Sequence, residues 1–150
     1  MAKIVLDTNI IVRAVASPSG LASELLRRTI SDENLLCTSN FMLAELDRVL
    51  RYPRVRKIHG LSETEIEDFV QSIQQVALVV EVDAAKTVRV TRDKDDDPVI
   101  ETALRSKADY LCSIDKDIGA KEVVDHCKAV GVKVVTDTVL IEILRNQDQE

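Results

Sequence analysis

Short apolar runs, rich in β-branched residues, alternate with segments of helical periodicity along this chain. The runs lie at residues 3–7, 35–39, 77–82, 109–114 and 132–136. The helical segments lie at residues 20–30, 41–51, 62–75, 97–107, 119–130 and 137–145. Strands that are separated by helices form a parallel sheet that is covered on both faces. The pattern therefore predicts an α/β fold, a three-layer α/β/α sandwich with a central, mostly parallel sheet of about five strands.

Local signals mark where several of these helices begin and end. Residues 62–65, Ser-Glu-Thr-Glu, form a capping box. Ser39 or Asn40 can cap the helix over 41–51, and Pro53 is expected to stop that helix. The pair Asp97-Pro98 indicates an N-cap followed by proline at the first helical position.

Length and composition indicate one domain over residues 1–150, with the last few residues disordered. Cys37, Cys112 and Cys127 form no CxxC pair, which indicates reduced thiols inside a cell, and we expect Cys37 and Cys112 in the core. Asp7 interrupts the first apolar segment, so the start is not typical of a signal peptide. No apolar run approaches a membrane span. We therefore expect a cytoplasmic protein without membrane contacts.

Composition also excludes several kinds of function. Aromatic residues make up only 3% of the chain, which argues against a surface that stacks bases. A net charge of -6 argues against binding polyanions by overall charge. His59 and His126 are the only histidines, which excludes a His-rich zinc site and disfavours paired-histidine ribonuclease chemistry. We expect both histidines to be solvated.

Acidic residues stand where two of the predicted strands end. Asp7 follows Ile4-Val5-Leu6, and Asp115 and Asp117 follow the strand that contains Cys112. Ligands and catalytic groups collect at the carboxyl ends of parallel strands. A turn or a helix N-cap is the alternative for each acid taken alone, but the repetition of the pattern favours a shared site.

Glu45 lies at the border of the apolar face of its predicted helix. Phe41 and Val49 are one turn away on either side. A carboxylate in that position is costly unless it is paired or binds a metal. We therefore favour a functional role over the alternative of a buried ion pair, for instance with an arginine.

A dense acidic run at Asp93, Asp95, Asp96 and Asp97 precedes the next helix. A solvated loop is the usual explanation of such a run. Carboxylates that share one small region raise one another's pKa, and a divalent cation removes that penalty. Oxygen ligands suit Mg2+ or Mn2+, and such sites promote phosphoryl chemistry.

The ordered set of these motifs resembles the PIN domain, and most closely its prokaryotic branch described as toxins of toxin–antitoxin systems. The resemblance runs from the first strand to Val134-Val135-Thr136. It rests on Val5-Leu6-Asp7-Thr8-Asn9, Leu43-Ala44-Glu45-Leu46, Asp95-Asp96-Asp97-Pro98-Val99-Ile100 and Ala108-Asp109-Tyr110-Leu111-Cys112-Ser113-Ile114-Asp115-Lys116-Asp117.

The resemblance implies an Mg2+- or Mn2+-dependent endoribonuclease that hydrolyses phosphodiester bonds in single-stranded RNA. It implies that Asp7, Glu45, Asp97 and Asp115 are catalytic and surround the metal, with Glu45 positioned to act on the attacking water. Possible additional site residues are Asp117, as an alternative to Asp115, Asp96, as an alternative to Asp97, and the polar motif residues Asn9 and Ser113.

A local basic cluster is the candidate for RNA phosphate contacts: Arg48, Arg51, Arg54, Arg56 and Lys57. A solvated helix end is the alternative for it. The family resemblance also implies a cognate antitoxin as partner and a homodimer.

Two other functions are compatible with parts of this pattern. One is a PIN-like binding module in RNA processing with weak or no catalysis, although all four acids are present. The other is a different carboxylate-metal phosphatase, such as a haloacid-dehalogenase-like enzyme. Haloacid-dehalogenase-like enzymes have a second acid two residues after the acid that ends their first strand, and this chain has Asn9 at that position.

Overall fold

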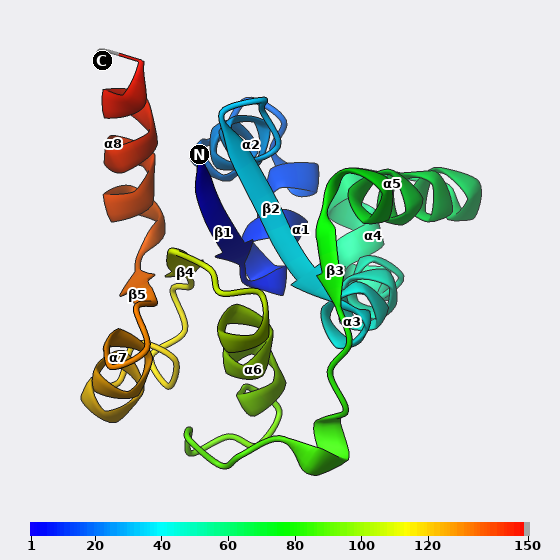
Figure 1. Ribbon diagram of the computed structural model, residues 1–150. Coiled ribbons are helices and arrows are strands. Elements are labelled where there is room, and N and C mark those ends of the chain that lie inside the picture. Colours follow the sequence, from blue (N-terminus) through cyan, green and yellow to red (C-terminus); the bar gives the residue numbers. More distant parts are fainter. Residues whose placement is uncertain (149–150) are drawn as a thin grey trace.

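Five parallel strands form the centre of the computed structural model, which describes residues 1–148. The strands pair in the order β3-β2-β1-β4-β5 (Figure 1). Their bounds are β1 (Ala2–Leu6), β2 (Asn34–Ser39), β3 (Leu78–Val80), β4 (Tyr110–Cys112) and β5 (Lys133–Val135). The predicted α/β fold with a central parallel sheet of five strands is confirmed, although most strands are shorter than the apolar runs that contain them.

Helices cover both faces of this sheet. Their bounds are α1 (Thr8–Ala16), α2 (Leu21–Thr29), α3 (Asn40–Leu50), α4 (Pro53–His59), α5 (Glu63–Val76), α6 (Asp97–Arg105), α7 (Lys121–Lys128) and α8 (Asp137–Gln147). A short 3-10 turn, η1 (Ala84–Lys86), lies between β3 and α6. The last residues, 149–150, lie outside the described part, so the predicted terminal disorder is not addressed there.

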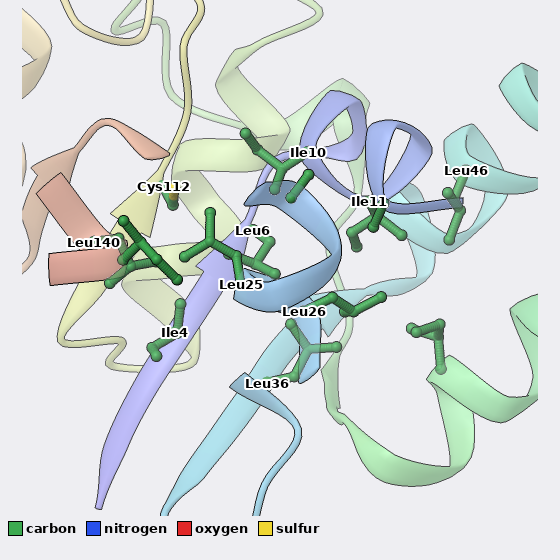
Figure 2. Close-up of a cluster of buried hydrophobic side chains, with 14 of the residues drawn as sticks. Ile4, Leu6, Ile10, Ile11, Leu25, Leu26, Leu36, Leu46, Cys112 and Leu140 are labelled. Carbon is green, nitrogen blue, oxygen red and sulfur yellow. The ribbon is translucent and has the colours of Figure 1, made fainter. Parts of the chain in front are cut away.

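Alternating side chains of β1 supply two separate cores. Ile4 and Leu6 point into one core, with residues of α1, α2, α3, α5 and α8 (Figure 2). Val5 points into the other core, which contains residues of α6 and α7. Successive side chains of a strand face opposite sides of the sheet, so a fully buried strand such as this one needs a helical layer on each face.

The strand order reverses at the carboxyl ends of β1 and β4, and we refer to this switch point as the crevice, after the place where α/β folds generally form one. From β1 the chain passes to β2 and β3 on one side, and then returns to β4 and β5 on the other side. Both neighbours pair with β1 in parallel register, Val5 with Cys37 and Leu6 with Cys112. The reversal of strand order between β1 and β4 is where α/β folds place their ligands.

Two helices were not predicted from the sequence. Helix α1 begins directly after Asp7, and its Ile-Ile-Val run has weak helical propensity. Burial of Ile10, Ile11 and Ala14 along one face outweighs that propensity. Helix α4 has no buried residue, and it begins at Pro53, which was predicted only as a stop. Gly60, with φ of 70°, ends α4 in the left-handed region.

Most of the predicted helix boundaries hold, but the start of α6 differs. Ser39 caps α3, and Ser62 and Glu65 form the predicted capping box of α5. At α6 the first helical residue is Asp97, and Asp96 occupies the N-cap position without a side-chain capping bond. The helix therefore starts one residue earlier than predicted, relative to its N-cap. Because neighbouring helical residues are rotated by about 100°, the carboxylates of Asp96 and Asp97 point in different directions.

The cysteines and His126 match their predictions, whereas His59 does not. Cys37, Cys112 and Cys127 are buried free thiols, and His126 is exposed on α7. The predicted solvation of His59 is wrong, because its ring is partly buried at the junction of α3 and α4. Its Nδ1 accepts from the Leu61 amide at 2.9 Å, so Nε2 must carry the hydrogen that bonds the Leu50 carbonyl oxygen at 2.9 Å.

Within residues 1–148, no helix is long and apolar enough to cross a membrane.

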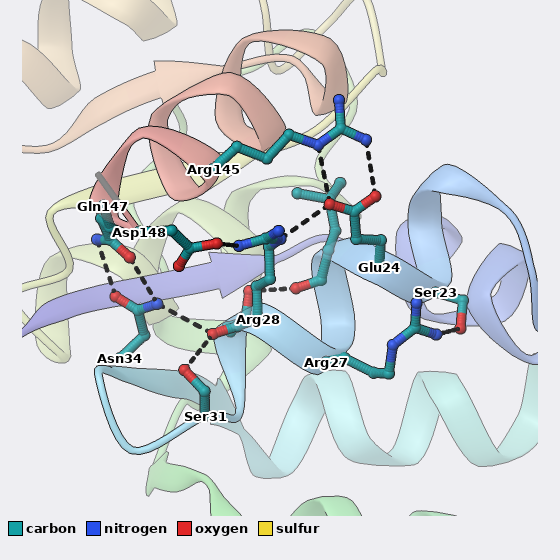
Figure 3. Close-up of polar contacts among 11 residues, drawn as sticks. Ser23, Glu24, Arg27, Arg28, Ser31, Asn34, Arg145, Gln147 and Asp148 are labelled. Atoms are coloured by element: carbon teal, nitrogen blue, oxygen red, sulfur yellow. Dashed lines mark hydrogen bonds and ion pairs between the residues drawn. The ribbon is translucent and has the colours of Figure 1, made fainter. Parts of the chain in front are cut away.

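A polar network joins α8 to α2 (Figure 3). Glu24 accepts two bonds from Arg145, at 2.7 and 2.9 Å, and one from Arg28 at 2.8 Å. Arg28 also reaches Asp148 at 2.7 Å. The hydrogen bonds from Arg145 and Arg28 lower the pKa of Glu24 to about 2. These contacts hold the C-terminal end of α8 against α2.

Replacing Glu24 with Gln should lower the melting temperature, and the loss should depend on pH. The folded carboxyl has a pKa of about 2, below its ordinary value of 4.5. Its contribution is therefore full above the ordinary value and is lost as the pH falls towards 2. Circular dichroism melts of the wild type and Glu24→Gln between pH 2 and 7 should converge at the acidic end. A constant gap across this range would contradict the role of the ionised group.

Candidate metal centre

Asp7 and Ser113 lie side by side at the carboxyl ends of the paired strands β1 and β4. Each directly follows its strand, and the strands are paired up to Leu6 and Cys112. The Ser113 hydroxyl donates to Asp7 Oδ2 at 2.7 Å, and the Thr8 amide donates to Asp7 Oδ1 at 2.8 Å. The turn and cap interpretations of Asp7 are thus partly true, since it caps α1 while it also contacts Ser113.

Asp7 carries a carboxyl whose charge is costly in its surroundings. It is only 7% exposed. Burial raises its pKa, the bonds from Ser113 and Thr8 oppose that effect, and the charges of Glu45 and Asp115 raise the pKa further. The charges among the largest causes of the shift are both those of acids. A cation in the crevice would therefore stabilise the ionised form of Asp7.

Glu45 projects from α3 towards this crevice and acts on Asp7 through its charge. Its side chain is 22% exposed. The alternative for Glu45 was a buried ion pair with an arginine. Its ion-pair contact is with Arg48, one helical turn away, whose Nη2 lies 4.0 Å from Glu45 Oε2. Arg48 is 60% exposed, so this is a loose surface contact that leaves the carboxylate available.

The loop after β4 is ordered by a chain of hydrogen bonds between its side chains and amides. The Ser113 hydroxyl accepts from the Asp115 amide at 3.0 Å, and Asp115 Oδ1 accepts from the Asp117 amide at 2.7 Å. Ser113 thereby connects Asp7 to both later acids. This local geometry accounts for the spacing of Ser113, Asp115 and Asp117 after β4.

Asp96 joins Asp115 and Asp117 from the N-terminus of α6. The three residues can each offer one carboxylate oxygen such that all three oxygens lie within 4.8 Å of one another. Asp96 Oδ2 is buried and has no hydrogen-bond partner in the described part of the chain. Burial, followed by the charges of Asp115, Asp93, Asp7 and Asp117, raises the pKa of Asp96 to about 7. An unpartnered buried oxygen in a field of like charges fits a hard divalent cation.

Asp97 is not part of this group of acids. Its Oδ1 accepts from the amides of Val90, at 2.9 Å, and Thr91, at 2.8 Å, and from the Thr91 hydroxyl at 3.0 Å. Its Oδ2 lies 3.1 Å from Arg89 Nε. Burial raises the pKa of Asp97, but the Thr91 and Val90 bonds and the Arg89 charge together lower it below its ordinary value. Successive helical residues are rotated by about 100°, which separates Asp97 from Asp96.

Two further polar residues of the first motif differ in their placement. Asn9 is exposed on the first turn of α1. Thr8 is 3% exposed, and its hydroxyl has no partner within residues 1–148. Thr8 was not predicted as a site residue, although its position directly after Asp7 at the strand end could have indicated one.

The predicted basic cluster is partly neutralised by acids of its own surface. Arg51 bonds Asp47 at 3.2 and 3.3 Å. Arg51 and Arg56 each lie 3.9 Å from Glu63. Arg54 and Lys57 are exposed and form no ion pair among residues 1–148. These two side chains, together with Arg48, whose contact with Glu45 is loose, are the cations of the cluster that can still contact an external anion.

Comparison with known proteins places this acidic crevice in a family context. A family model described as PIN domain matches residues 3–117, the segment that contains every acid of the crevice. An uncharacterized protein of Methanocaldococcus jannaschii is 28% identical over 116 residues. That match covers 77% of this chain and 72% of the archaeal protein.

Proposed function

Because this chain belongs to the PIN domain family, we propose that it is a divalent-metal-dependent endoribonuclease that hydrolyses phosphodiester bonds in single-stranded RNA. PIN domains are generally metal-dependent nucleases that act on RNA. The observation that carries the proposal is the set of three acids, Asp96, Asp115 and Asp117, that gathers beside Asp7 with one buried oxygen unpartnered.

Asp7, Asp96, Asp115 and Asp117 are the proposed ligands of Mg2+ or Mn2+. Their oxygen-only donors suit either ion. A bound ion would supply an activated water and would neutralise charge on the phosphate. Ser113 orients the Asp7 carboxylate through its hydroxyl, and Glu45 is placed to hold or accept a proton of the attacking water.

Asp96, rather than Asp97, is the ligand that we propose from α6. Asp97 Oδ1 already accepts three hydrogen bonds, and Asp97 Oδ2, which has no hydrogen-bond partner among residues 1–148, lies 3.1 Å from Arg89 Nε. Asp96 has a free oxygen and lies with Asp115 and Asp117. The sequence implied that an acid at this helix start is a metal ligand. We propose that this acid is Asp96, one residue before Asp97.

The proposed RNA contacts are Arg54 and Lys57, with Arg48 as a third cation. Arg48 lies on α3, the helix of Glu45, and Arg54 and Lys57 lie on the next helix. These cations would counter the net charge of -6 on the surface of α3 and α4. Reversing the charge of Arg54 and Lys57 should lower the salt dependence of RNA binding.

A role as the toxin of a toxin–antitoxin pair, as a homodimer in the cytoplasm, is the finer form of this proposal. It rests on the resemblance of the motifs to that branch of the family. Expression of the chain should then arrest growth, and the Asp7→Asn variant should not. Light scattering of the purified protein tests the dimer, and co-purification with the product of the adjacent gene tests for an antitoxin.

Cleavage of a labelled single-stranded RNA, with and without metal, tests the chemistry. We expect cleavage with Mg2+ or Mn2+, none with EDTA, and recovery when excess metal is returned. Calorimetric titration with Mn2+ should detect binding. Metal binding without cleavage of RNA would favour the binding module, and hydrolysis of a phosphate monoester instead of RNA would favour the phosphatase.

A further inference from the structure

The segment that leads into Asp96 has almost no regular structure. Between β3 and α6 it contains only the short turn η1. Its first part is held by Asn40, whose Nδ2 donates to the Val82 carbonyl oxygen at 3.1 Å and whose Oδ1 accepts from the Val82 amide at 2.7 Å. A segment of this kind needs further anchors if its last residue is to be placed reproducibly.

Asp97 supplies the second anchor at the other end of the segment. Its carboxylate is 1% exposed and accepts bonds from two successive backbone amides, those of Val90 and Thr91. Acids at a helix start usually bond amides of their own helix. Asp97 instead bonds a segment six and seven residues earlier in the chain, which makes the contact a tertiary one.

Thr91 passes this restraint on to the turn that carries Asp96. Its hydroxyl contacts both the Asp93 carbonyl oxygen and Asp97 Oδ1, and its one hydrogen serves one of them at a time. The Asp96 amide donates to the same Asp93 carbonyl oxygen at 3.0 Å. Residues 90–93 are therefore folded back over the first turn of α6.

Arg89 closes the arrangement from the solvent side. Its Nε lies 3.1 Å from Asp97 Oδ2, although its side chain is 63% exposed. Oδ1 of the buried carboxylate thus accepts the hydrogen bonds, and Oδ2, which has no hydrogen-bond partner among residues 1–148, faces the charge of Arg89. Removing the carboxylate would leave the buried amide of Thr91 and the partly buried amide of Val90 without this acceptor.

We propose that Asp97 is a positioning residue that ties residues 89–93 to α6 and so places Asp96 among Asp115 and Asp117. The effect on cleavage rests on the proposed function, because it acts through Asp96. The tie itself does not depend on that function. Amide exchange at Val90 and Thr91 can therefore test it in protein that holds no metal.

Hydrogen exchange of metal-free wild type, Asp97→Asn and Asp97→Ala is the first measurement. We expect the Val90 and Thr91 amides to exchange about tenfold faster or more in Asp97→Ala, the loss of a hydrogen bond being worth about that factor. Asp97→Asn keeps one acceptor oxygen and should retain most of the protection. Unchanged exchange in Asp97→Ala would overturn the proposal. If Asp97→Ala does not fold, Thr91→Val should still speed exchange at Asp96, and protection equal to wild type would overturn the proposal.

Calorimetric titration with Mn2+ is the second measurement, on the same variants. We expect Asp97→Asn to bind within about threefold of wild type and Asp97→Ala to bind about tenfold more weakly, as for other residues that orient metal ligands. Loss of Mn2+ binding in Asp97→Asn, with the two amides still protected, would make Asp97 a ligand and overturn the proposal. If the wild type bound no Mn2+, the proposed metal centre would be refuted. The exchange data would still show whether Asp97 holds residues 89–93 against α6.

Discussion

Replacing Asp7 with Asn should abolish RNA cleavage and leave the fold intact. The amide keeps an oxygen for the Thr8 amide, and the Ser113 hydroxyl can accept as well as donate. What is lost is the negative charge at the end of β1, which interacts with those of Glu45 and Asp115. We expect cleavage to fall by more than about 100-fold, beyond what the loss of an orienting partner typically costs.

The stability of metal-free Asp7→Asn provides an independent readout. Burial and the charges of Glu45 and Asp115 make the wild-type carboxylate costly. The variant should therefore melt at or above the wild-type temperature in EDTA. Asp125 is an exposed acid on α7 whose ion pair within residues 1–148 is with Lys121 at the surface, so Asp125→Asn is the matched control and should cleave RNA normally. Cleavage by Asp7→Asn at the wild-type rate would refute its assignment as a ligand.

Replacing Asp96 with Asn should abolish Mn2+ binding and change how stability depends on pH. In EDTA the wild-type carboxyl has a pKa of about 7, raised from an ordinary value of 3.8. The folded state then binds more protons than the unfolded state between those values, so wild-type stability should fall as the pH rises from about 4 to 7. The variant has no such group, and its melting temperature should fall less over this range.

Asp95→Asn is the matched control for Asp96. It removes one charge from the same acidic run, but the Asp95 side chain is exposed and lies outside the group of three acids. Thermal melts in EDTA and calorimetry with Mn2+ should group Asp95→Asn with the wild type. If the two variants lost Mn2+ binding equally, overall charge rather than coordination by Asp96 would explain the effect.

Much of the fold follows from local patterns in the chain. The apolar runs at the positions of β1 to β5 and the helical periodicity between them predict the parallel sheet and both helical layers. Helix α1 was missed because its β-branched run resembles a strand, and only its burial against the sheet makes it helical. Helix α4 was missed because none of its residues is fully buried, so the helix carries little periodic signal.

The sequence alone determined that acids would gather at the carboxyl ends of β1 and β4. An apolar strand that ends in a carboxylate is a local feature, and parallel pairing brings two such ends together without further information. The contact between Asp7 and Ser113 follows from the register of Leu6 with Cys112. The spacing of Ser113, Asp115 and Asp117 likewise needs only the hydrogen bonds of one short loop.

Only the tertiary structure decided which acid of the run before α6 faces that crevice. Asp96 and Asp97 are chemically identical neighbours, and the helix start could have lain at either residue. The amides of Val90 and Thr91 and the cation of Arg89 engage Asp97, which leaves Asp96 with Asp115 and Asp117. Which oxygens find partners depends on how the segment after β3 folds back over α6, and no local pattern encodes that path.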